Sequence, residues 1–208
     1  MDSELSELVA QIRQCRICRD TPLAKPLPHE PNPVVVASPN ARVLIAGQAP
    51  GTRVHASGIP FDDRSGDRLR QWLGVTREEF YNPELFAIVP MGFCFPGQDL
   101  RGSDLPPRRE CAPAWREPLL AMMPQVELVL AIGSYAQAWH LPGDPRAKLG
   151  ERVADWRAIV MRNSSPRILP LPHPSWRNTA WLNRNPWFET DLLPFLQREI
   201  RIRIGAAI

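Results

Sequence analysis

The chain has 208 residues, 24 of them proline, and a formal net charge of +3. This length suffices for one hydrophobic core, so we expect a single domain over residues 1–208. No apolar run is long enough to span a bilayer, and residues 1–13 are polar and acidic rather than signal-like. These features exclude a membrane-spanning protein and predict a cytoplasmic one without a membrane partner.

The first 40 residues are predicted to form a helix followed by a proline-rich connector. Apolar residues between positions 3 and 13 recur at the spacing of one helical face. Cys15 and Cys18 follow directly. From residue 21 to residue 40 prolines recur and no hydrophobic period holds, which predicts an extended segment running toward the first strand.

A glycine turn closes the first predicted strand. Residues 43–46 are an unbroken apolar run, as expected for a strand buried on both faces of a parallel sheet. The sequence then reads Gly47, Gln48, Ala49, Pro50, Gly51. Open α/β sheets place ligands at such turns because the backbone can approach closely. We expect a small flat or anionic group to bind there.

Strands and helices alternate along the rest of the chain. Further strands are predicted at residues 85–91, 126–132 and 167–171, and helices at 65–73, 107–123, 134–140, 150–160 and 186–201. Ser65 is the expected N-cap of the second helix, and residues 52–60 are expected to be a loop. This order predicts an α/β protein, a three-layer α/β/α sandwich around a mainly parallel four-stranded sheet.

Four cysteines, Cys15, Cys18, Cys94 and Cys111, are candidate metal ligands. The first pair has Cys-x-x-Cys spacing, and the second pair flanks a loop that could bring both thiolates to the same point. Four thiolates suit an iron–sulfur cluster or a structural Zn²⁺ equally well. The alternative is a redox-type or incidental Cys-x-x-Cys together with two ordinary buried cysteines.

A histidine stands at the end of the fourth predicted strand. His173 lies between Pro172 and Pro174, which restrict the backbone on both sides. An imidazole at a strand end, opposite a glycine turn, can donate a hydrogen bond to a carbonyl or a developing anion. It can equally hold loop backbone together.

These motifs together resemble the uracil-DNA glycosylase superfamily. The resemblance rests on the turn from Gly47 to Gly51, on Gly58-x-Pro60-Phe61, and on His173-Pro174-Ser175. The four cysteines resemble, in order and spacing, the ligands of the iron–sulfur branch of bacteria and archaea. The similarity covers residues 15–196.

The resemblance implies a monofunctional hydrolytic glycosylase that removes a flipped-out deaminated base, uracil foremost, from damaged DNA in base-excision repair. It also implies a structural [4Fe–4S] cluster, rather than zinc, in a bacterial cytoplasmic protein. By the same resemblance Gly47, Gln48 and Ala49 contact the base, Phe61 stacks on it, and His173 hydrogen-bonds its carbonyl oxygen. Nothing demands more than a monomer.

Three departures separate this chain from the pattern of the family. No carboxylate stands in the glycine turn, where this chain has Ala49, and the later acidic positions of the iron–sulfur branch hold Val54 and His55. His55 is therefore the candidate water activator, with Asp62 and Asp63 as weaker alternatives. The asparagine that reads the pyrimidine edge is replaced by Pro90, which leaves hypoxanthine or xanthine open as substrates.

The segment after His173 is the expected DNA contact. It mixes hydrogen-bond donors, cations and large apolar side chains: Ser175, Trp176, Arg177, Asn178 and Leu182. Such a mixture can hold phosphates and fill the gap left by an extruded nucleotide.

Two other functional classes fit parts of the sequence. A damage sensor that binds lesions or abasic sites without cutting them would need neither the carboxylate nor the asparagine. A small-molecule α/β enzyme could bind phosphate at the glycine turn, but it would leave the cysteines and the Arg-Trp segment unused.

Overall fold

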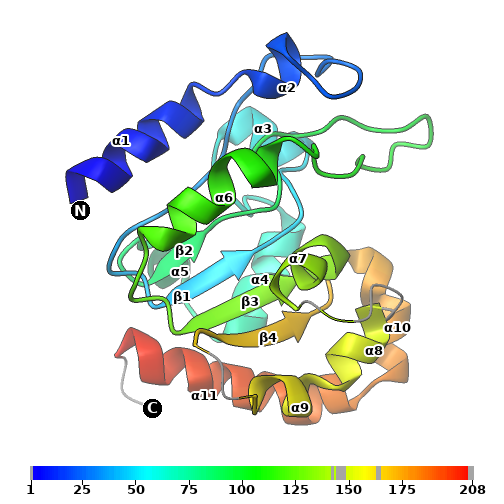
Figure 1. Ribbon diagram of the computed structural model, residues 1–208. Coiled ribbons are helices and arrows are strands. Elements are labelled where there is room, and N and C mark those ends of the chain that lie inside the picture. Colours follow the sequence, from blue (N-terminus) through cyan, green and yellow to red (C-terminus); the bar gives the residue numbers. More distant parts are fainter. Residues whose placement is uncertain (1, 142, 144–148, 163–164, 206–208) are drawn as a thin grey trace.

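A computed structural model describes residues 2–141, 143, 149–162 and 165–205 of the chain. Within these residues the sheet has four strands, in the order β2 (Phe86–Ile88), β1 (Val43–Ala46), β3 (Leu128–Ile132), β4 (Arg167–Leu171). Every neighbouring pair is parallel. Helices cover both faces of the sheet (Figure 1), which confirms the α/β sandwich.

Side chains of the strands alternate between two hydrophobic cores. Val43 and Ile45 of β1 lie in one core, and Leu44 and Ala46 lie in the other. A strand buried on both faces needs apolar residues at every position, which explains the unbroken apolar runs. None of the described helices is both long and apolar enough to cross a bilayer.

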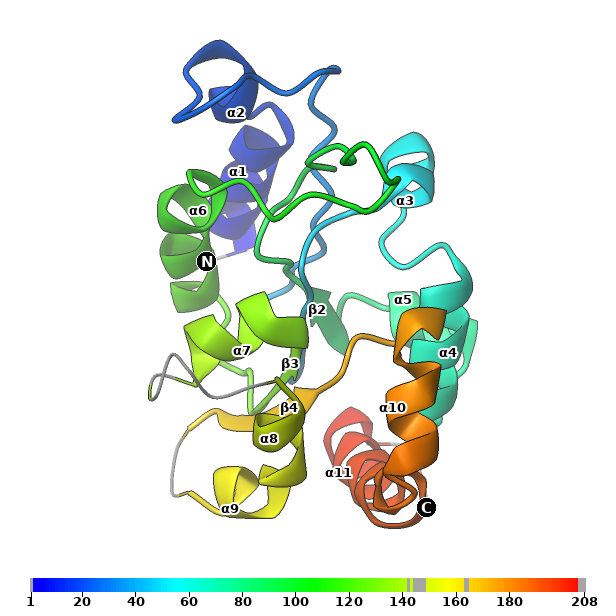
Figure 2. The same cartoon turned by 90° about the vertical axis from the view of Figure 1, so that its right-hand side faces the viewer.

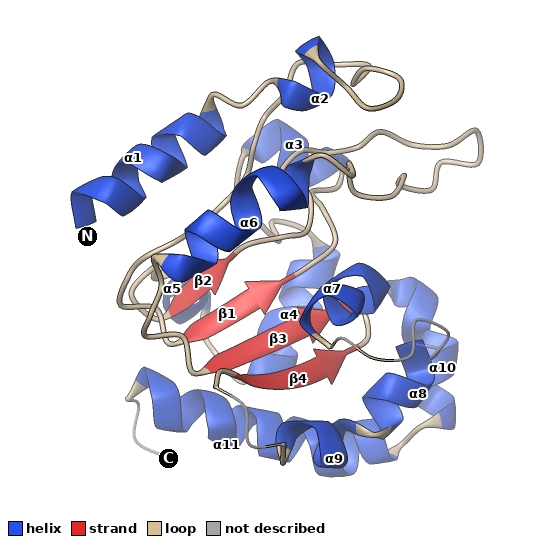
Figure 3. Ribbon diagram, in the orientation of Figure 1, coloured by secondary structure: helices blue, strands red, loops and turns tan. Residues whose placement is uncertain are grey.

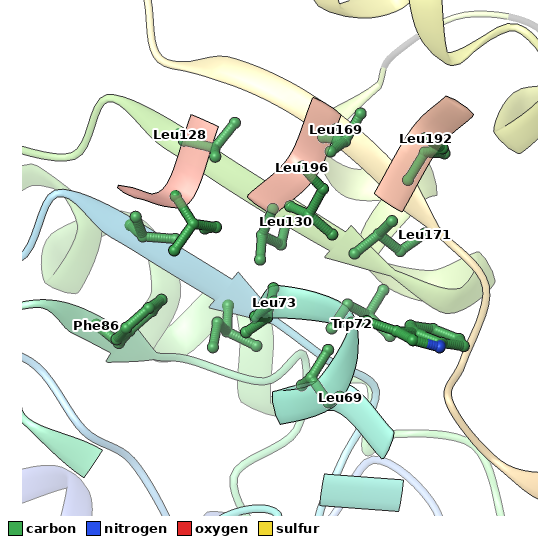
Figure 4. Packing of buried hydrophobic residues seen from close by; sticks show 14 of the residues in the cluster. Leu69, Trp72, Leu73, Phe86, Leu128, Leu130, Leu169, Leu171, Leu192 and Leu196 are labelled. Atoms are coloured by element: carbon green, nitrogen blue, oxygen red, sulfur yellow. The ribbon is translucent and has the colours of Figure 1, made fainter. Parts of the chain in front are cut away.

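The first core lies beneath α4 (Arg64–Leu73), α5 (Arg77–Tyr81), α9 (Trp156–Val160) and α11 (Leu193–Ile204). Figure 4 shows Leu69 and Trp72 of α4, with Leu196 of α11, packed against the leucines of β3 and β4. The second core lies beneath α1 (Asp2–Arg13), α6 (Cys111–Ala121) and α7 (Gly133–His140). Figure 3 shows the sheet enclosed between these helical layers.

The connector over residues 21–40 runs along the outer edge of β2. Val36 and Ile88 exchange two backbone hydrogen bonds, of 3.0 and 2.8 Å, in an antiparallel bridge. Further on, the Val34 N–H donates to the Phe93 carbonyl oxygen at 2.7 Å. The edge of β2 is thereby paired, and the connector that follows Cys15 and Cys18 is hydrogen-bonded to the segment that bears Cys94.

Several predicted boundaries were wrong. Residues 52–60, predicted as loop, contain the helix α3 (Thr52–Ser57), which ends at Gly58 in the left-handed conformation. The N-cap of α4 is Asp63 rather than Ser65, since Asp63 Oδ1 accepts the Gly66 N–H at 2.9 Å. The helix predicted at 150–160 is two helices, α8 (Leu149–Ala154) and α9.

Short elements account for most of the remaining differences. The helix α2 (Ile17–Asp20) and α5 were not predicted. After β4 the chain forms a 3₁₀ turn (Trp176–Asn178) and α10 (Thr179–Arg184), and a π-helical turn (Phe188–Leu192) precedes α11. Segments this short bury too few residues to show a hydrophobic period in the sequence.

Candidate active site

A cavity of about 530 Å³ lies at the carboxyl ends of β1, β2 and β4. The turn after β1 lines it through residues 47–51, the end of β2 through Ile88 and Pro90, and the segment after β4 through His173. Figure 2 shows α3, α10 and the loop that follows β2 around this end of the sheet. Two sequence motifs more than 120 residues apart therefore share one cavity.

The glycine turn is held against the segment after β2. The carbonyl oxygens of Gly47 and Gln48 accept the N–H groups of Met91 and Gly92, both at 2.9 Å. These bonds fix the peptide planes of the turn. A Cβ on Gly47 would lie 3.4 Å from Cζ of Phe61, an ordinary contact distance, so the phenyl ring lies directly against the strand end.

Phe61 is held in an unusual backbone conformation. Its φ is 55°, in the left-handed region that non-glycine residues rarely adopt. Gly66 of α4 makes this possible, because a Cβ there would meet the Phe61 carbonyl oxygen at 1.8 Å. The Tyr81 hydroxyl donates to the Pro60 carbonyl oxygen at 3.0 Å, and the ring of Phe80 meets Phe61 edge-on. The phenyl ring is thus a fixed wall of the cavity.

His173 is oriented by two hydrogen bonds from its own loop. The Ser175 N–H donates to Nδ1 of His173 at 3.2 Å, and Nδ2 of Asn178 donates to the His173 carbonyl oxygen at 2.7 Å. With Nδ1 accepting, the proton of the neutral imidazole is on Nε2. Nε2 is therefore a hydrogen-bond donor.

Burial lowers the pKa of His173, and the nearby Arg177 lowers it further. The carboxylates of Asp63 and Asp104 act in the opposite direction without reversing the shift. The imidazole is therefore a neutral donor at pH 7.

The segment after His173 forms an exposed rim. Trp176 is 75% exposed, and the Arg177 guanidinium lies 6.0 Å from the centre of its ring. Arg68 of α4 donates to the Ser175 carbonyl oxygen at 3.2 Å and ties the rim to the helix. Leu182 of α10 instead packs against the first core and is not among the residues that line the cavity.

His55 also lies apart from the cavity lining. Its ring on α3 lies tilted against those of His29 and Phe95, with centroid distances of 4.3 and 5.8 Å, and is not among the residues that line the cavity. Burial lowers the pKa of His55, and His29 adds to the effect. The structure therefore does not bring His55 together with Gln48 and His173.

Among the described residues, two carboxylates line the cavity, and the sequence pointed to only one of them. The sequence pattern offers Asp63 as a weaker alternative to His55, but it does not predict Asp104, which lies in the loop between Cys94 and Cys111. Gln98 of the same loop also lines the cavity. Only the fold of this loop brings Gln98 and Asp104 near the glycine turn, so no local sequence pattern predicts that they line the cavity.

The family comparison agrees with this geometry. The sequence model of the uracil DNA glycosylase superfamily matches residues 34–197, well over half of the chain. The chain belongs to this superfamily. Membership supports a DNA glycosylase-type function, with DNA as the macromolecule acted on.

The end of β2 presents an apolar wall to the cavity. Pro90, which lines the cavity, has no N–H, and its carbonyl oxygen accepts a hydrogen bond from the fully buried Arg116 at 2.9 Å. Arg116 also donates to the Val89 carbonyl oxygen, and its other nitrogen contacts Nε2 of His140 at 2.8 Å. Pro90 therefore has no free donor with which to recognise a base.

The four cysteines line a second, small cavity between the connector and α6. Cys15, Cys18, Cys94 and Cys111 share it with Leu27, Pro31, Pro33 and Phe93. The Phe93 N–H lies 3.3 Å from Sγ of Cys111, and Nε1 of Trp115 lies 3.2 Å from Sγ of Cys15. Among the described residues, no group of three or more Cys, His, Asp or Glu is placed to hold a single metal ion.

Burial keeps three of these thiols protonated in the absence of a metal. It raises the pKa of Cys18 to about 11, and of Cys94 and Cys111 to about 12. A metal centre would stabilise the thiolate forms instead. The shared cavity, its apolar lining and the N–H donors to sulfur fit a thiolate-ligated group.

Replacing Gly66 with alanine is expected to displace Phe61. The added Cβ meets backbone rather than a flexible side chain, so we expect the free energy of unfolding to fall by about 1–3 kcal/mol. Urea denaturation measures this. Gly51→Ala is the matched control, because its φ of −86° and its 3.5 Å contact accommodate a Cβ. Equal stability of the two variants would contradict the account.

The imidazole of His173 is expected to titrate below its ordinary value of 6.5. Protonating Nδ1 would set two N–H groups against each other at the Ser175 contact. The unfolded chain binds that proton more readily, so the neutral ring stabilises the fold above about pH 6.5, and this contribution is lost as the pH falls through the lower folded pKa. NMR titration, assigned with His173→Gln, checks it. A folded pKa at or above 6.5 would refute the expectation.

Proposed function

We propose that this protein is a monofunctional DNA glycosylase that hydrolyses the N-glycosidic bond of a flipped-out deaminated base, uracil foremost, in base-excision repair. The observation that supports this best is the shared cavity of about 530 Å³, lined by the glycine turn and by His173. Its residues 1–40 and the superfamily region would act as one glycosylase-like domain. Among the described residues that line the cavity there is no lysine, so the nucleophile we propose is water.

Base removal needs the nucleotide outside the DNA stack. A base in the duplex cannot reach a cavity at the sheet edge until it is rotated out of the helix. We assign the face of the base to Phe61, whose ring is fixed by its backbone and by Phe80. The edge of the base would meet the backbone N–H groups of Gln48 and Ala49, where glycine and alanine leave room for close approach.

His173 would stabilise the departing base. As the bond to the sugar breaks, negative charge grows on the base and a carbonyl oxygen becomes a stronger acceptor. The Nε2–H of neutral His173 can donate to that oxygen without transferring its proton. Burial, which lowers the pKa of His173, preserves this neutral donor at physiological pH.

The exposed rim would hold the DNA. Arg177 is the proposed phosphate contact, with Ser175 and Asn178 beside it at the mouth of the cavity. Trp176, 75% exposed and at the same mouth, is the proposed wedge for the vacated position in the stack. Leu182 is less suited to this role because it packs against the core.

Pro90 supports a second candidate activity. A wall without a free donor does not select the pyrimidine edge, so the cavity would also accept hypoxanthine or xanthine. Weak discrimination among deaminated bases follows from the same wall, because a site rejects analogues strongly only through polar groups that they leave unpaired.

The cysteine cavity is the proposed site of a structural [4Fe–4S] cluster, with zinc as the alternative. Cys15, Cys18, Cys94 and Cys111 would be its ligands, and the N–H donors at Phe93 and Trp115 would hydrogen-bond the sulfur atoms. The cluster would join α1 and the connector to the loop after β2. It would take no part in cutting the glycosidic bond.

Cleavage of defined oligonucleotides tests the proposed activity. With uracil, hypoxanthine and xanthine substrates and alkali to break abasic sites, we expect the wild-type protein to cut uracil-containing DNA. We expect His173→Ala to lower the single-turnover rate by about 10²–10³-fold, since it removes one donor to the developing anion. His29→Ala, outside the cavity lining, is the control.

The other outcomes separate the functional classes. Lesion binding without strand breaks would identify a damage sensor instead. A protein with no affinity for any of these DNAs would overturn both interpretations.

Absorbance tests the cysteine site independently of activity. Protein purified without oxygen is expected to be brown, with an absorbance band at about 400 nm that Cys94→Ser abolishes. The same substitution should lower the thermal midpoint, because the connector and the loop lose their common anchor. Colourless wild-type protein holding zinc, or no metal, would refute the cluster.

A further inference from the structure

The proposed reaction needs a group that the glycine turn does not provide. Water must reach the sugar carbon as the base leaves, and a carboxylate beside it can orient it and take its proton. Ala49 carries no such group, and His55 lies with His29 and Phe95 outside the cavity lining. The water activator must therefore come from another segment of the chain.

In the part of the chain that the structure describes, the carboxylates at the cavity are Asp63 and Asp104. Asp63 already has a structural partner, because its Oδ1 accepts the Gly66 N–H and caps α4. Asp104 accepts a hydrogen bond from Nε2 of Gln98 through Oδ1, at 3.1 Å. Its Oδ2 lies 3.5 Å from the position that a Cβ of Gly51 would take. Asp104 thus presents its second oxygen directly over the glycine turn.

The loop holds Asp104 at that place through its own backbone. Gln98 and Asp104 form an antiparallel bridge, and the Leu105 N–H donates to the Gly97 carbonyl oxygen at 2.9 Å. Within the loop, Oδ1 of Asp99 accepts the N–H groups of Arg101 and Ser103 at 2.8 and 2.9 Å. The carboxylate is therefore carried by a hairpin-like loop with defined geometry.

Asp104 also acts on the other end of the cavity. Its negative charge acts to raise the pKa of His173, against the effect of burial, so the carboxylate and the imidazole lie in electrostatic range of each other. A base between the glycine turn and His173 would have its sugar toward the mouth, where Asp104 is exposed. A negative charge there also favours the positive charge that develops on the sugar.

We propose that Asp104 is the catalytic carboxylate that orients and deprotonates the hydrolytic water, in place of a carboxylate in the turn. As the glycosidic bond breaks, its electron pair goes to the base. The water oxygen then bonds to the sugar carbon, and the proton of the water passes to Oδ2 of Asp104 and later to solvent. This assignment rests on the proposed glycosylase function.

Three single substitutions test it under single-turnover conditions on the best wild-type substrate. Asp104→Asn keeps size and hydrogen bonding but removes the base, so we expect a rate loss of about 10²-fold or more. Asp63→Asn keeps the cap, because asparagine caps helices as well as aspartate, and should lose less than about 10-fold. Asp99→Asn removes one charge from the same loop outside the cavity lining, while the amide oxygen can still accept the Arg101 and Ser103 N–H groups, so its rate should stay at the wild-type value.

Affinity for uncleavable DNA carrying an abasic-site analogue separates chemistry from binding. We expect Asp104→Asn to bind this DNA as well as the wild type or better, because one negative charge is lost. If the wild-type protein cuts and Asp104→Asn retains the wild-type rate, this assignment alone is overturned. A rate loss in Asp63→Asn that exceeds the loss in Asp104→Asn would overturn it too. A wild-type protein that cuts no base would overturn the assignment together with the proposed function.

Discussion

Parallel pairing of the four strands places all their carboxyl ends at one edge of the sheet, and the cavity depends on this constraint. β1 delivers the glycine turn, β2 delivers Pro90 and β4 delivers His173 to the same edge. In the order β2-β1-β3-β4, β2 lies on one side of β1, and β3 and β4 lie on the other. The chain therefore reverses its direction across the sheet after β2. Such reversals open a crevice where open α/β sheets bind ligands.

Burial sets the electrostatic character of this edge. It keeps His173 neutral, and it lowers the pKa of His140 to about 3, so that His140 can accept from the Arg116 guanidinium. Arg116 is fully buried and lies behind Pro90, to whose carbonyl oxygen it donates. A neutral donor faces the cavity while a cation lies behind its wall. This arrangement suits a reaction in which negative charge develops on the bound group.

The fold was largely predictable because the strands are buried on both faces and therefore read as apolar runs. The same runs located the glycine turn and His173 at strand ends. The cap of α4 was misplaced, because Asp63 and Ser65 are both good caps and only the backbone decides between them. Asp104 could not be predicted, since its position depends on how the loop between Cys94 and Cys111 folds over Gly51. The sequence pattern predicted His55 as a site residue, but its ring is not part of the cavity lining.

The decisive experiment is a crystal structure with duplex DNA that carries an uncleavable deoxyuridine analogue. We expect the uracil to lie outside the helix and inside the cavity, with one face on Phe61 and one carbonyl oxygen within about 3 Å of Nε2 of His173. Uracil left stacked in the duplex, or bound away from the glycine turn and His173, would contradict this expectation.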